Sequence, residues 1–284
     1  MRGAWLMAIL PVWLTLALSG HALAATGLAA GNGMHGDRAR AGAASWVDWA
    51  RLQDLPAPVA RYFRLVLSDG QPIYRQAHFD QEGTVRTSTK TEQWMPFKAV
   101  LTFSGDTPGF TWEATMQMAP LVRIQVSDSY TAGVGEGRVR LWSWIPMGHD
   151  RATPEMNSGS LHRYLAEAVW CPTALWPREG LRWTAIDDTR ALATLSDHGV
   201  SVSLEFRFNP AGEVVGVFSP GRWGSFEGGY KQVAWEGHFR DYHEQDGMRI
   251  PRYGEVGWYD SGVWQPVWKG TIRRAAFVTG PSDE

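Results

Sequence analysis

The stretch of sequence that decides the fold is residues 201–208, which read SVSLEFRF and lead into the turn NPAG at residues 209–212. Apolar and polar residues alternate through it, as expected for a β-strand with one buried face. Residues 111–116, TWEATM, alternate in the same way, and Asp246-Gly247 indicates a tight turn between two further strands. About ten to twelve such segments, at the short spacing typical of an antiparallel sandwich or barrel, predict a mainly β fold.

Two helices are expected to interrupt the sheet. Apolar residues recur at helical spacing within residues 46–67, which predicts an N-terminal helix. A mid-chain helix is predicted to begin at Asn157 or Ser158, the candidate N-caps, and to end before Pro172. This mid-chain helix has a core stripe of Leu161, Leu165 and Ala168 and a second stripe of Arg163, Glu167 and Trp170.

Residues 1–24 have the features of a signal peptide. An apolar run follows the single charge of Arg2, and residues 22–24 have the small-x-small form of a signal-peptidase site. We therefore expect a periplasmic or secreted protein after cleavage at Ala24, with anchoring to the inner membrane by residues 4–23 as the alternative. No cysteine lies directly after the apolar run, which excludes attachment of a lipid to a cysteine at that point.

The rest of the chain divides into three segments. Residues 25–44 are rich in alanine and glycine and lack apolar periodicity, so they are expected to form a flexible linker. Residues 45–277 hold the strand and helix patterns and are predicted to form a single β-rich domain. Residues 278–284 are expected to be a disordered tail.

The composition excludes several classes of protein. The chain has 284 residues, 44% of them hydrophobic, and a net charge of −2, which is typical of a folded globular protein. A near-neutral charge gives no electrostatic case for binding nucleic acid. The single cysteine, Cys171, excludes an intramolecular disulfide and a cysteine-rich zinc site. The signatures of metalloproteases, P-loop enzymes and serine hydrolases are missing, so no catalytic residue, metal site or cofactor is assigned.

The mid-chain helix carries one candidate site, because the stripe with Arg163 and Glu167 either forms an exposed ion pair or faces a cavity. A second polar cluster lies where a predicted strand runs into the glycine-rich turn at residues 133–137. Spacing in the sequence does not bring the two clusters together. The candidate ligand-binding residues, taken from the helix, this cluster and the strand tryptophans, are Arg123, Asp128, Tyr130, Arg163, Tyr164, Glu167, Trp170 and Trp235.

Tryptophan is the compositional outlier, with 16 residues in the chain. An indole ring buries a large apolar area while keeping an N–H group that needs a partner. The rings are therefore expected to fill the concave face of a wide sheet, to line a ligand cavity, or to form stacking platforms for sugar rings. Those on predicted strands or strand ends are Trp94, Trp112, Trp142, Trp144, Trp183, Trp235, Trp258, Trp264 and Trp268.

Five motifs carry a resemblance to a known family, and the most specific is RYLAEAxWxP at residues 163–172. The others are LPxPVxRY at residues 55–62, WxPFxA at residues 94–99, DxYxxGxG at residues 128–135, and WEG at residues 235–237 with Tyr242, Gly247, Ile250 and Pro251 after it. Over residues 55–272, the chain resembles an uncharacterised bacterial family of unknown function.

A C-terminal hairpin adds a second resemblance. It reads FRDY at residues 239–242 and DGMRIP at residues 246–251, and it is similar to a hairpin of the LolA/LolB-like outer-membrane lipoprotein carriers. This likeness implies a curved antiparallel sheet, a LolA-like half-barrel, with the N-terminal and mid-chain helices over its open face. It also implies a concave, apolar interior that holds acyl chains.

These observations predict an exported protein that binds a lipid, a lipoprotein acyl chain or another hydrophobic small molecule in a tryptophan-lined cavity beneath the mid-chain helix. Arg163 and Arg123 would meet an anionic head group. The alternatives are an exported hydrolase that uses Glu167, Asp128 or His162 as acid/base groups, and a carbohydrate-binding protein with exposed tryptophan platforms. We expect a monomer, and association with a membrane surface stays open.

Overall fold

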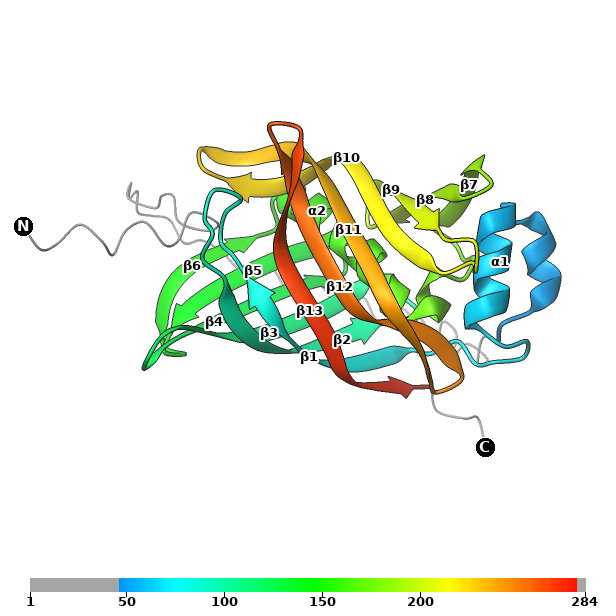
Figure 1. Cartoon of the computed structure of the whole chain (residues 1–284), viewed down its shortest axis with the longest axis horizontal. Coiled ribbons are helices and arrows are strands. Elements are labelled where there is room, and N and C mark those ends of the chain that lie inside the picture. Colours follow the sequence, from blue (N-terminus) through cyan, green and yellow to red (C-terminus); the bar gives the residue numbers. More distant parts are fainter. Residues whose placement is uncertain (1–45, 280–284) are drawn as a thin grey trace, which may run out of the picture.

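The computed structural model describes residues 46–279, which form a 13-stranded antiparallel sheet with few helices (Figure 1). The strands are β1 (Gln76–Val85), β2 (Met95–Ser104), β3 (Gly109–Ala119), β4 (Val122–Thr131), β5 (Val134–Leu141), β6 (Ile145–Arg151), β7 (Leu181–Asp187), β8 (Arg190–Asp197), β9 (Val200–Phe208), β10 (Val214–Phe226), β11 (Gly229–Gln245), β12 (Met248–Asp260) and β13 (Val263–Val278). The helices are α1 (Ala57–Val66) and α2 (Pro154–Glu167), with the 3-10 turns η1 (Trp49–Asp54), η2 (Ala168–Trp170) and η3 (Pro172–Leu175).

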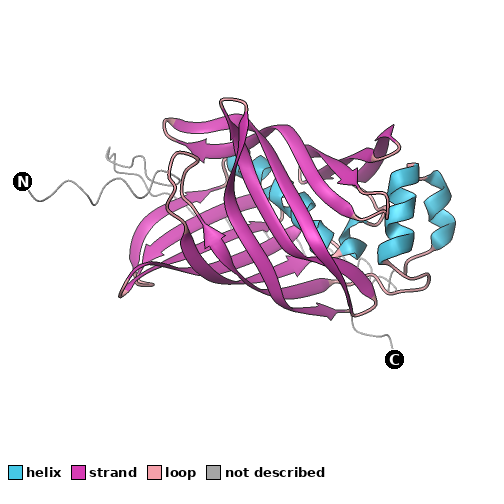
Figure 2. Ribbon diagram, viewed as in Figure 1, coloured by secondary structure: helices cyan, strands magenta, loops and turns pink. Residues whose placement is uncertain are grey.

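The strands lie in the order β6-β5-β4-β3-β2-β1-β13-β12-β11-β10-β9-β8-β7. The first strand therefore pairs with the last, and this pair joins the two halves of the chain in one sheet. The sheet curls into a half-barrel, and α2 lies on its concave side (Figure 2). The expected fold class, a mainly β half-barrel with few helices, is confirmed, although the strands outnumber the ten to twelve that the turn spacing indicated.

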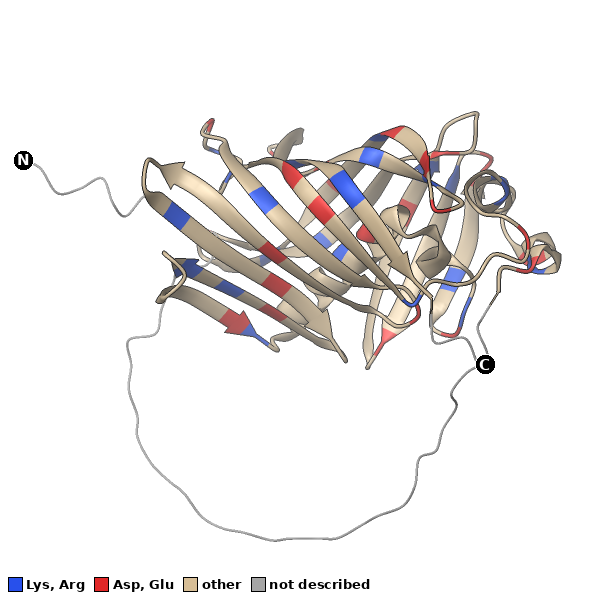
Figure 3. Ribbon diagram, turned by 90° about the horizontal axis from the view of Figure 1, so that it is seen from below, with Lys and Arg blue, Asp and Glu red and all other residues tan. Residues whose placement is uncertain are grey.

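The alternation of side chains determines which face of each strand is buried. In β3, Trp112, Ala114 and Met116 are buried, while their neighbours on the other face are exposed. The apolar residues of β9 are buried in the same way. Charged residues of both signs occur along the strands (Figure 3). In β2 and β3, Lys98 and Glu113 take exposed positions that alternate with buried apolar ones, so the outer surface there is hydrated.

The N-terminal helical segment is shorter than predicted, because it is split at Leu55-Pro56. The first part is η1, whose N-cap Asp48 accepts a hydrogen bond from the backbone of Ala50. Only the second part, α1, is an α-helix, and its apolar face packs at one end of the half-barrel, where Tyr62 lies against Phe208 with 5.8 Å between ring centroids. The proline separates the two parts, since the residue before it avoids helical geometry.

The mid-chain helix begins earlier than predicted, and the candidate N-caps Asn157 and Ser158 were wrong. Thr153 is the N-cap: its hydroxyl accepts a hydrogen bond from the backbone of Met156 at 3.1 Å, and Pro154 occupies the first turn. The Asn157 side chain instead accepts a hydrogen bond from the backbone of a strand residue in β5. The predicted core stripe is confirmed, because Leu161, Leu165 and Ala168 are all buried.

Helix α2 spans the concave face, where it packs against β4 and β5 on one side and β9 and β10 on the other. Two glycines permit this close approach. A Cβ atom on Gly135 would lie 2.8 Å from the carbonyl oxygen of Met156, and one on Gly159 would lie 2.9 Å from that of Trp223. Contacts this short essentially do not occur in folded proteins, so α2 can lie this close to the sheet only because positions 135 and 159 are glycine.

Several expectations fall outside the described residues. The signal peptide at residues 1–24 and the linker at residues 25–44 are among them, as are the last residues of the predicted tail, although β13 extends to Val278. Within residues 46–279, no helix is both long enough and apolar enough to cross a membrane.

Candidate ligand-binding cavity

A cavity of about 640 Å³ lies between the concave face of the sheet and α2. Its walls come from both halves of the sheet, because strands β1–β5 contribute to one side and β10–β13 to the other. Most of its lining is apolar and aromatic, which is typical of a small-molecule site. The aromatic side chains in the lining are Phe110, Trp112, Trp170, Trp223, Phe226, Tyr230, Trp235, Phe239, Trp258, Tyr259 and Trp268.

Trp170 lies in the aromatic wall of this cavity. It follows α2 directly, in η2, and packs against Phe239 and Trp268 at centroid distances of 6.0 and 6.1 Å. Gly254 makes room for the indole ring, because a Cβ atom there would meet it at 3.0 Å. The aromatic wall is therefore close-packed around this ring.

Arg163 of α2 is the best-paired charge in the cavity. Its Nη1 donates to Asp128 Oδ2 at 2.9 Å and its Nε donates to Glu167 Oε1 at 2.7 Å. The guanidinium also lies over the rings of Phe110 and Trp112, 4.9 Å from each centroid. Two carboxylates and two aromatic faces therefore hold this cation.

Burial and mutual attraction both shift the pKa values of Asp128, Arg163 and Glu167. Burial raises the pKa of Asp128 and of Glu167, although the Arg163 guanidinium beside them acts in the opposite sense. Burial alone would lower the pKa of Arg163, but the two carboxylates outweigh it and raise that pKa. Each carboxylate also has a second oxygen, Asp128 Oδ1 and Glu167 Oε2, with no hydrogen-bond partner among residues 46–279.

Arg222 is a second cation in the cavity, and sequence reasoning missed it. Its guanidinium lies between the rings of Trp235 and Trp258, at 4.8 and 5.1 Å, and its Nη2 donates to the carbonyl of Gly159 at 3.0 Å. It forms no ion pair with any described residue, and its Nε has no partner among them. Burial, with repulsion from Arg163, lowers the pKa of Arg222 to about 10.

A β-bulge places Arg222 in the cavity. The pairing of β10 with β11 shifts register between Ser219 and Arg222, around Pro220-Gly221. Proline and glycine within a strand pattern are the sequence signal of such a bulge, so this signal could have identified the position.

The structure brings five of the eight predicted ligand-binding residues together. Asp128, Arg163, Glu167, Trp170 and Trp235 all line the cavity, although they come from β4, α2, η2 and β11. The predicted stripe of Arg163, Glu167 and Trp170 faces the cavity, and so do earlier residues of the same helix, Met156, Gly159 and Ser160 among them.

The other three predicted residues lie elsewhere. Arg123 is exposed on β4 and does not line the cavity, so it does not meet a ligand there. Tyr130 is buried and donates its hydroxyl hydrogen to Asp197 Oδ2 at 2.8 Å. Tyr164 stacks on Phe103 with a centroid distance of 4.6 Å and points away from the apolar walls it was expected to form.

The three hydrolase candidates do not all meet. Asp128 and Glu167 converge on Arg163, but His162 lies outside the lining, buried between the carbonyl groups of Ser158 and Ser203. Burial lowers the pKa of His162 to about 4, so this ring is neutral near pH 7. The arrangement therefore places two carboxylates on one guanidinium, with no histidine beside them.

The predicted tryptophan platforms are not arranged on the strands as the sugar-binding alternative requires. Trp112, Trp183 and Trp235 are buried. Trp142 and Trp144, predicted as strand residues, lie in the turn between β5 and β6 and are exposed. Trp94, Trp258, Trp264 and Trp268 are half-buried. Of the nine predicted residues, the two in this turn are the exposed ones, so the strands do not present a line of exposed rings.

The mouth of the cavity is bordered by charged side chains of the β1–β2 loop and the β10–β11 turn. Lys90 and Glu227 face each other across it at 4.0 Å, and both are well exposed. Arg86, by contrast, is buried and donates to the carbonyl oxygen of Thr91 and to Gln265 Oε1. The β1–β2 loop is therefore anchored at its base by Arg86. At its tip it is held by a solvent-exposed ion pair, which contributes little to stability.

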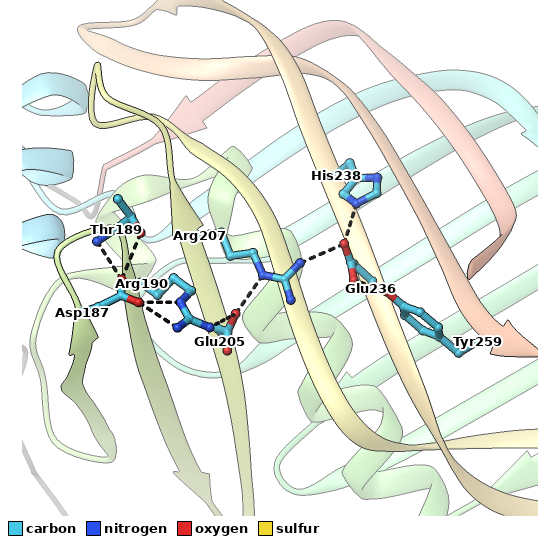
Figure 4. A network of polar contacts seen from close by, with 8 residues as sticks. All are labelled: Asp187, Thr189, Arg190, Glu205, Arg207, Glu236, His238 and Tyr259. Carbon is cyan, nitrogen blue, oxygen red and sulfur yellow. Dashed lines mark hydrogen bonds and ion pairs between the residues drawn. The ribbon is translucent and has the colours of Figure 1, made fainter. Parts of the chain in front are cut away.

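A polar network on the outer face contrasts with the cavity (Figure 4). Glu236 accepts hydrogen bonds from Arg207 and Tyr259 and lies 2.7 Å from His238 Nε2, and Arg207 in turn bonds Glu205. These partners satisfy the carboxylate, and the pKa of Glu236 is lowered by them although burial opposes the shift. Such a network stabilises the strands and leaves no group of Glu236 free for a ligand. Among the described residues, no cluster of side chains is suited to a metal ion.

A family model described as a family of unknown function, DUF6544, matches residues 45–270. The match spans most of the chain, so the chain belongs to this family, and the resemblance to an uncharacterised family is confirmed. The crystal structure of a LolA superfamily protein from Nitrosomonas europaea is similar, with a TM-score of 0.41 and 10% identity; the match covers 80% of this chain and 94% of that one. No curated protein matches the chain.

Proposed function

We propose that this member of the DUF6544 family binds an elongated hydrophobic ligand, such as a lipid, in the cavity beneath α2. The observation that carries the proposal is the cavity itself: it has a volume of about 640 Å³, its walls are mostly aromatic and aliphatic, and its charged side chains are balanced in sign. Ligand sites commonly have volumes of about 300–1,000 Å³ and this kind of lining.

The energetics favour an apolar occupant. Removing apolar ligand surface from water contributes roughly 25 cal/mol per Å², before the costs of association are subtracted. The aromatic wall around Trp170 is close-packed, so it is ready to receive a chain without rearrangement. In the proposal, the polar residues orient the ligand, and the apolar walls supply most of the affinity.

Filling the cavity is expected to weaken ligand binding strongly. Val126 on β4 lines the cavity, and Val126→Trp would place an indole ring in the space of the ligand. Native mass spectrometry of protein purified without detergent is expected to show about one bound lipid per wild-type chain and about a tenfold lower occupancy in the variant. A wild-type chain that neither retains a lipid nor binds one saturably after delipidation would contradict the proposal.

The matched control is Val100→Trp on β2. Val100 is 47% exposed on the outer face, so the same substitution there leaves the cavity unchanged. The control is expected to retain the lipid. The mass of the chain in the same spectrum also tests export, which we propose from residues 1–24: loss of these residues supports cleavage at Ala24, and their retention supports the membrane anchor.

Two neighbouring turns carry exposed apolar side chains, and these favour association of the protein with a membrane surface. Leu121 between β3 and β4, and Trp142 and Trp144 between β5 and β6, are 90%, 45% and 73% exposed, and we call them the apolar tip. Trp142 Nε1 donates to the carbonyl of Leu121 at 2.8 Å, which joins the two turns. Leu121 and Trp142 have φ angles of 66° and 50°, a left-handed conformation that costs energy outside glycine.

The charge around the apolar tip suits an anionic bilayer. Residues 117–127 and 137–148 contain Arg123, Arg138 and Arg140 and no aspartate or glutamate. Arg138 pairs with the adjacent Glu136, so Arg123 and Arg140 supply the positive charge that no described carboxylate pairs with. Indole rings favour the interface between headgroups and acyl chains, and basic side chains are attracted to anionic lipids. We therefore propose that the apolar tip contacts the membrane surface while the protein exchanges its ligand.

Polar substitution in the apolar tip is expected to weaken this contact. Trp144→Ser should reduce partition onto vesicles of phosphatidylcholine and phosphatidylglycerol by about tenfold in a sedimentation assay, because one exposed indole is lost. Ile186→Ser, which changes an exposed apolar residue on β7, is the control and should sediment like wild type. Equal sedimentation of Trp144→Ser and wild type would exclude the apolar tip as a membrane contact.

A further inference from the structure

The charges of the cavity cancel. Five cationic and five anionic side chains contribute to its lining, and the deeper part holds two of each: Arg163 and Arg222 against Asp128 and Glu167. At the mouth, Lys90 pairs with Glu227. A ligand with a net charge would therefore bring an uncompensated charge into a low-dielectric space, which is costly.

The unpartnered polar atoms of the cavity are of two kinds. Two are carboxylate oxygens, Asp128 Oδ1 and Glu167 Oε2, which accept hydrogen bonds. Two are N–H groups, Arg222 Nε and Trp170 Nε1, which donate them. All four are buried and belong to residues that line the cavity, and a buried polar atom without a partner destabilises its surroundings.

These two observations define the polar end of the ligand. Building on the proposed function, we infer that the ligand carries an uncharged group that both donates and accepts hydrogen bonds, the hydroxyl groups of a monoacylglycerol, rather than a carboxylate or a phosphate. The hydroxyl groups donate to the free oxygens of Asp128 and Glu167 and accept from Arg222 and Trp170. The acyl chain lies along the aromatic wall.

The pairing of Arg163 argues against the anionic head group expected from the sequence. Asp128 and Glu167 both form ion pairs with Arg163, so the positive charge of Arg163 is already compensated and does not attract an anionic head group. Arg222 would attract a ligand carboxylate, but that carboxylate would also face Asp128 and Glu167, whose electrostatic influence reaches Arg222. A hydroxyl group meets the same donors without this repulsion.

The test compares two ligands with the same saturated acyl chain, a monoacylglycerol and the corresponding fatty acid. Binding to the delipidated full chain is measured at about pH 8, where the fatty acid is ionised, by displacement of a fluorescent lipid. The monoacylglycerol is expected to bind at least about tenfold more tightly, since a charged or unsatisfied group is disfavoured in the cavity.

Two charge-removing variants make the test specific. Asp128→Asn and Glu167→Gln each leave the cavity with one net positive charge, so each is expected to shift the preference toward the fatty acid by about tenfold. Asp241→Asn removes a negative charge from an exposed position on β11 and should leave the preference unchanged. Because the readout is a ratio of two affinities in one sample, a partly unfolded variant does not alter it.

The outcomes separate the two proposals. Preference for the monoacylglycerol in wild type, reduced in both charge-removing variants, supports the uncharged head group. Equal or tighter binding of the fatty acid by wild type overturns this inference but leaves the hydrophobic cavity intact. Binding of neither ligand, nor of the fluorescent lipid, overturns the proposed function and the inference with it.

Discussion

Replacement of Arg163 by methionine is expected to lower the free energy of unfolding by about 3–5 kcal/mol, the range typical of breaking a buried ion pair on one side. The side chain is only 19% exposed and bonds both Asp128 and Glu167. Methionine keeps the contacts with Phe110 and Trp112 but leaves two buried carboxylates without their cation. Urea denaturation followed by tryptophan fluorescence measures this loss.

The loss should depend on pH, with a sign set by the carboxyl groups. Burial raises the pKa of Asp128 and Glu167 in the folded protein, and removal of Arg163 raises it further. The folded variant therefore binds protons more tightly than the unfolded chain, so its stability falls as pH rises from the ordinary carboxyl range through these raised values. The difference from wild type is expected to be larger at about pH 8 than at about pH 5.

Arg190→Met provides the matched control. Arg190 pairs with Asp187 and Glu205 on the outer face, and its side chain is 44% exposed (Figure 4). Water solvates those carboxylates when the arginine is removed, so the stability should stay close to that of wild type at both pH values. If the two variants lost the same stability, the burial of the Asp128 and Glu167 charges would not be the cause.

Substitution of Gly135 by valine is expected to destabilise the protein by about 3 kcal/mol or more, since overpacking displaces backbone as well as side chains. A Cβ atom there would lie 2.7 Å from Ser160 Oγ and 2.8 Å from the carbonyl oxygen of Met156. The same residue bonds α2 through its N–H group, which donates to Asn157 Oδ1 at 2.8 Å. Valine would push α2 away from β5.

This displacement should also weaken ligand binding. Helix α2 carries Arg163 and Glu167, so moving it opens the cavity and separates Arg163 from Asp128 on β4. Thermal unfolding and lipid displacement, measured on the same preparation, report the two effects. Gly109→Val on β3 is the control, because a Cβ atom there has ordinary contacts of 3.5 Å; it should keep both properties. Wild-type stability of Gly135→Val would show that α2 tolerates a larger separation from the sheet.

The local features of this protein could be predicted from its sequence. Strand alternation depends on neighbouring residues only, and the pattern of residues 201–208 correctly predicted the buried face of β9. The stripe Leu161, Leu165 and Ala168 was predicted for the same reason, because helical periodicity is local. The start of α2 was missed because Thr153, Asn157 and Ser158 are all able to cap a helix, and packing against β5 decides which one does.

The site was partly predictable. Arg163, Glu167 and Trp170 lie on one stripe, so the helix alone indicated that they act together. Their partner Asp128 was recognised as a candidate, but its contact with Arg163 joins residues 35 positions apart and depends on how α2 crosses the sheet. Arg222 was missed because a register shift in β10, rather than regular alternation, directs it into the cavity.

The sequence by itself therefore determined the strands, the core stripes of the helices and the stripe that faces the cavity, since each follows from the period of the backbone. The tertiary structure alone decided which charges meet. Curvature of the sheet brings β4, α2 and β10 around one space, where Arg163 receives two carboxylates and Arg222 receives none. Burial in that space increases the interaction energies of these charges, because electrostatic interactions strengthen where water is excluded.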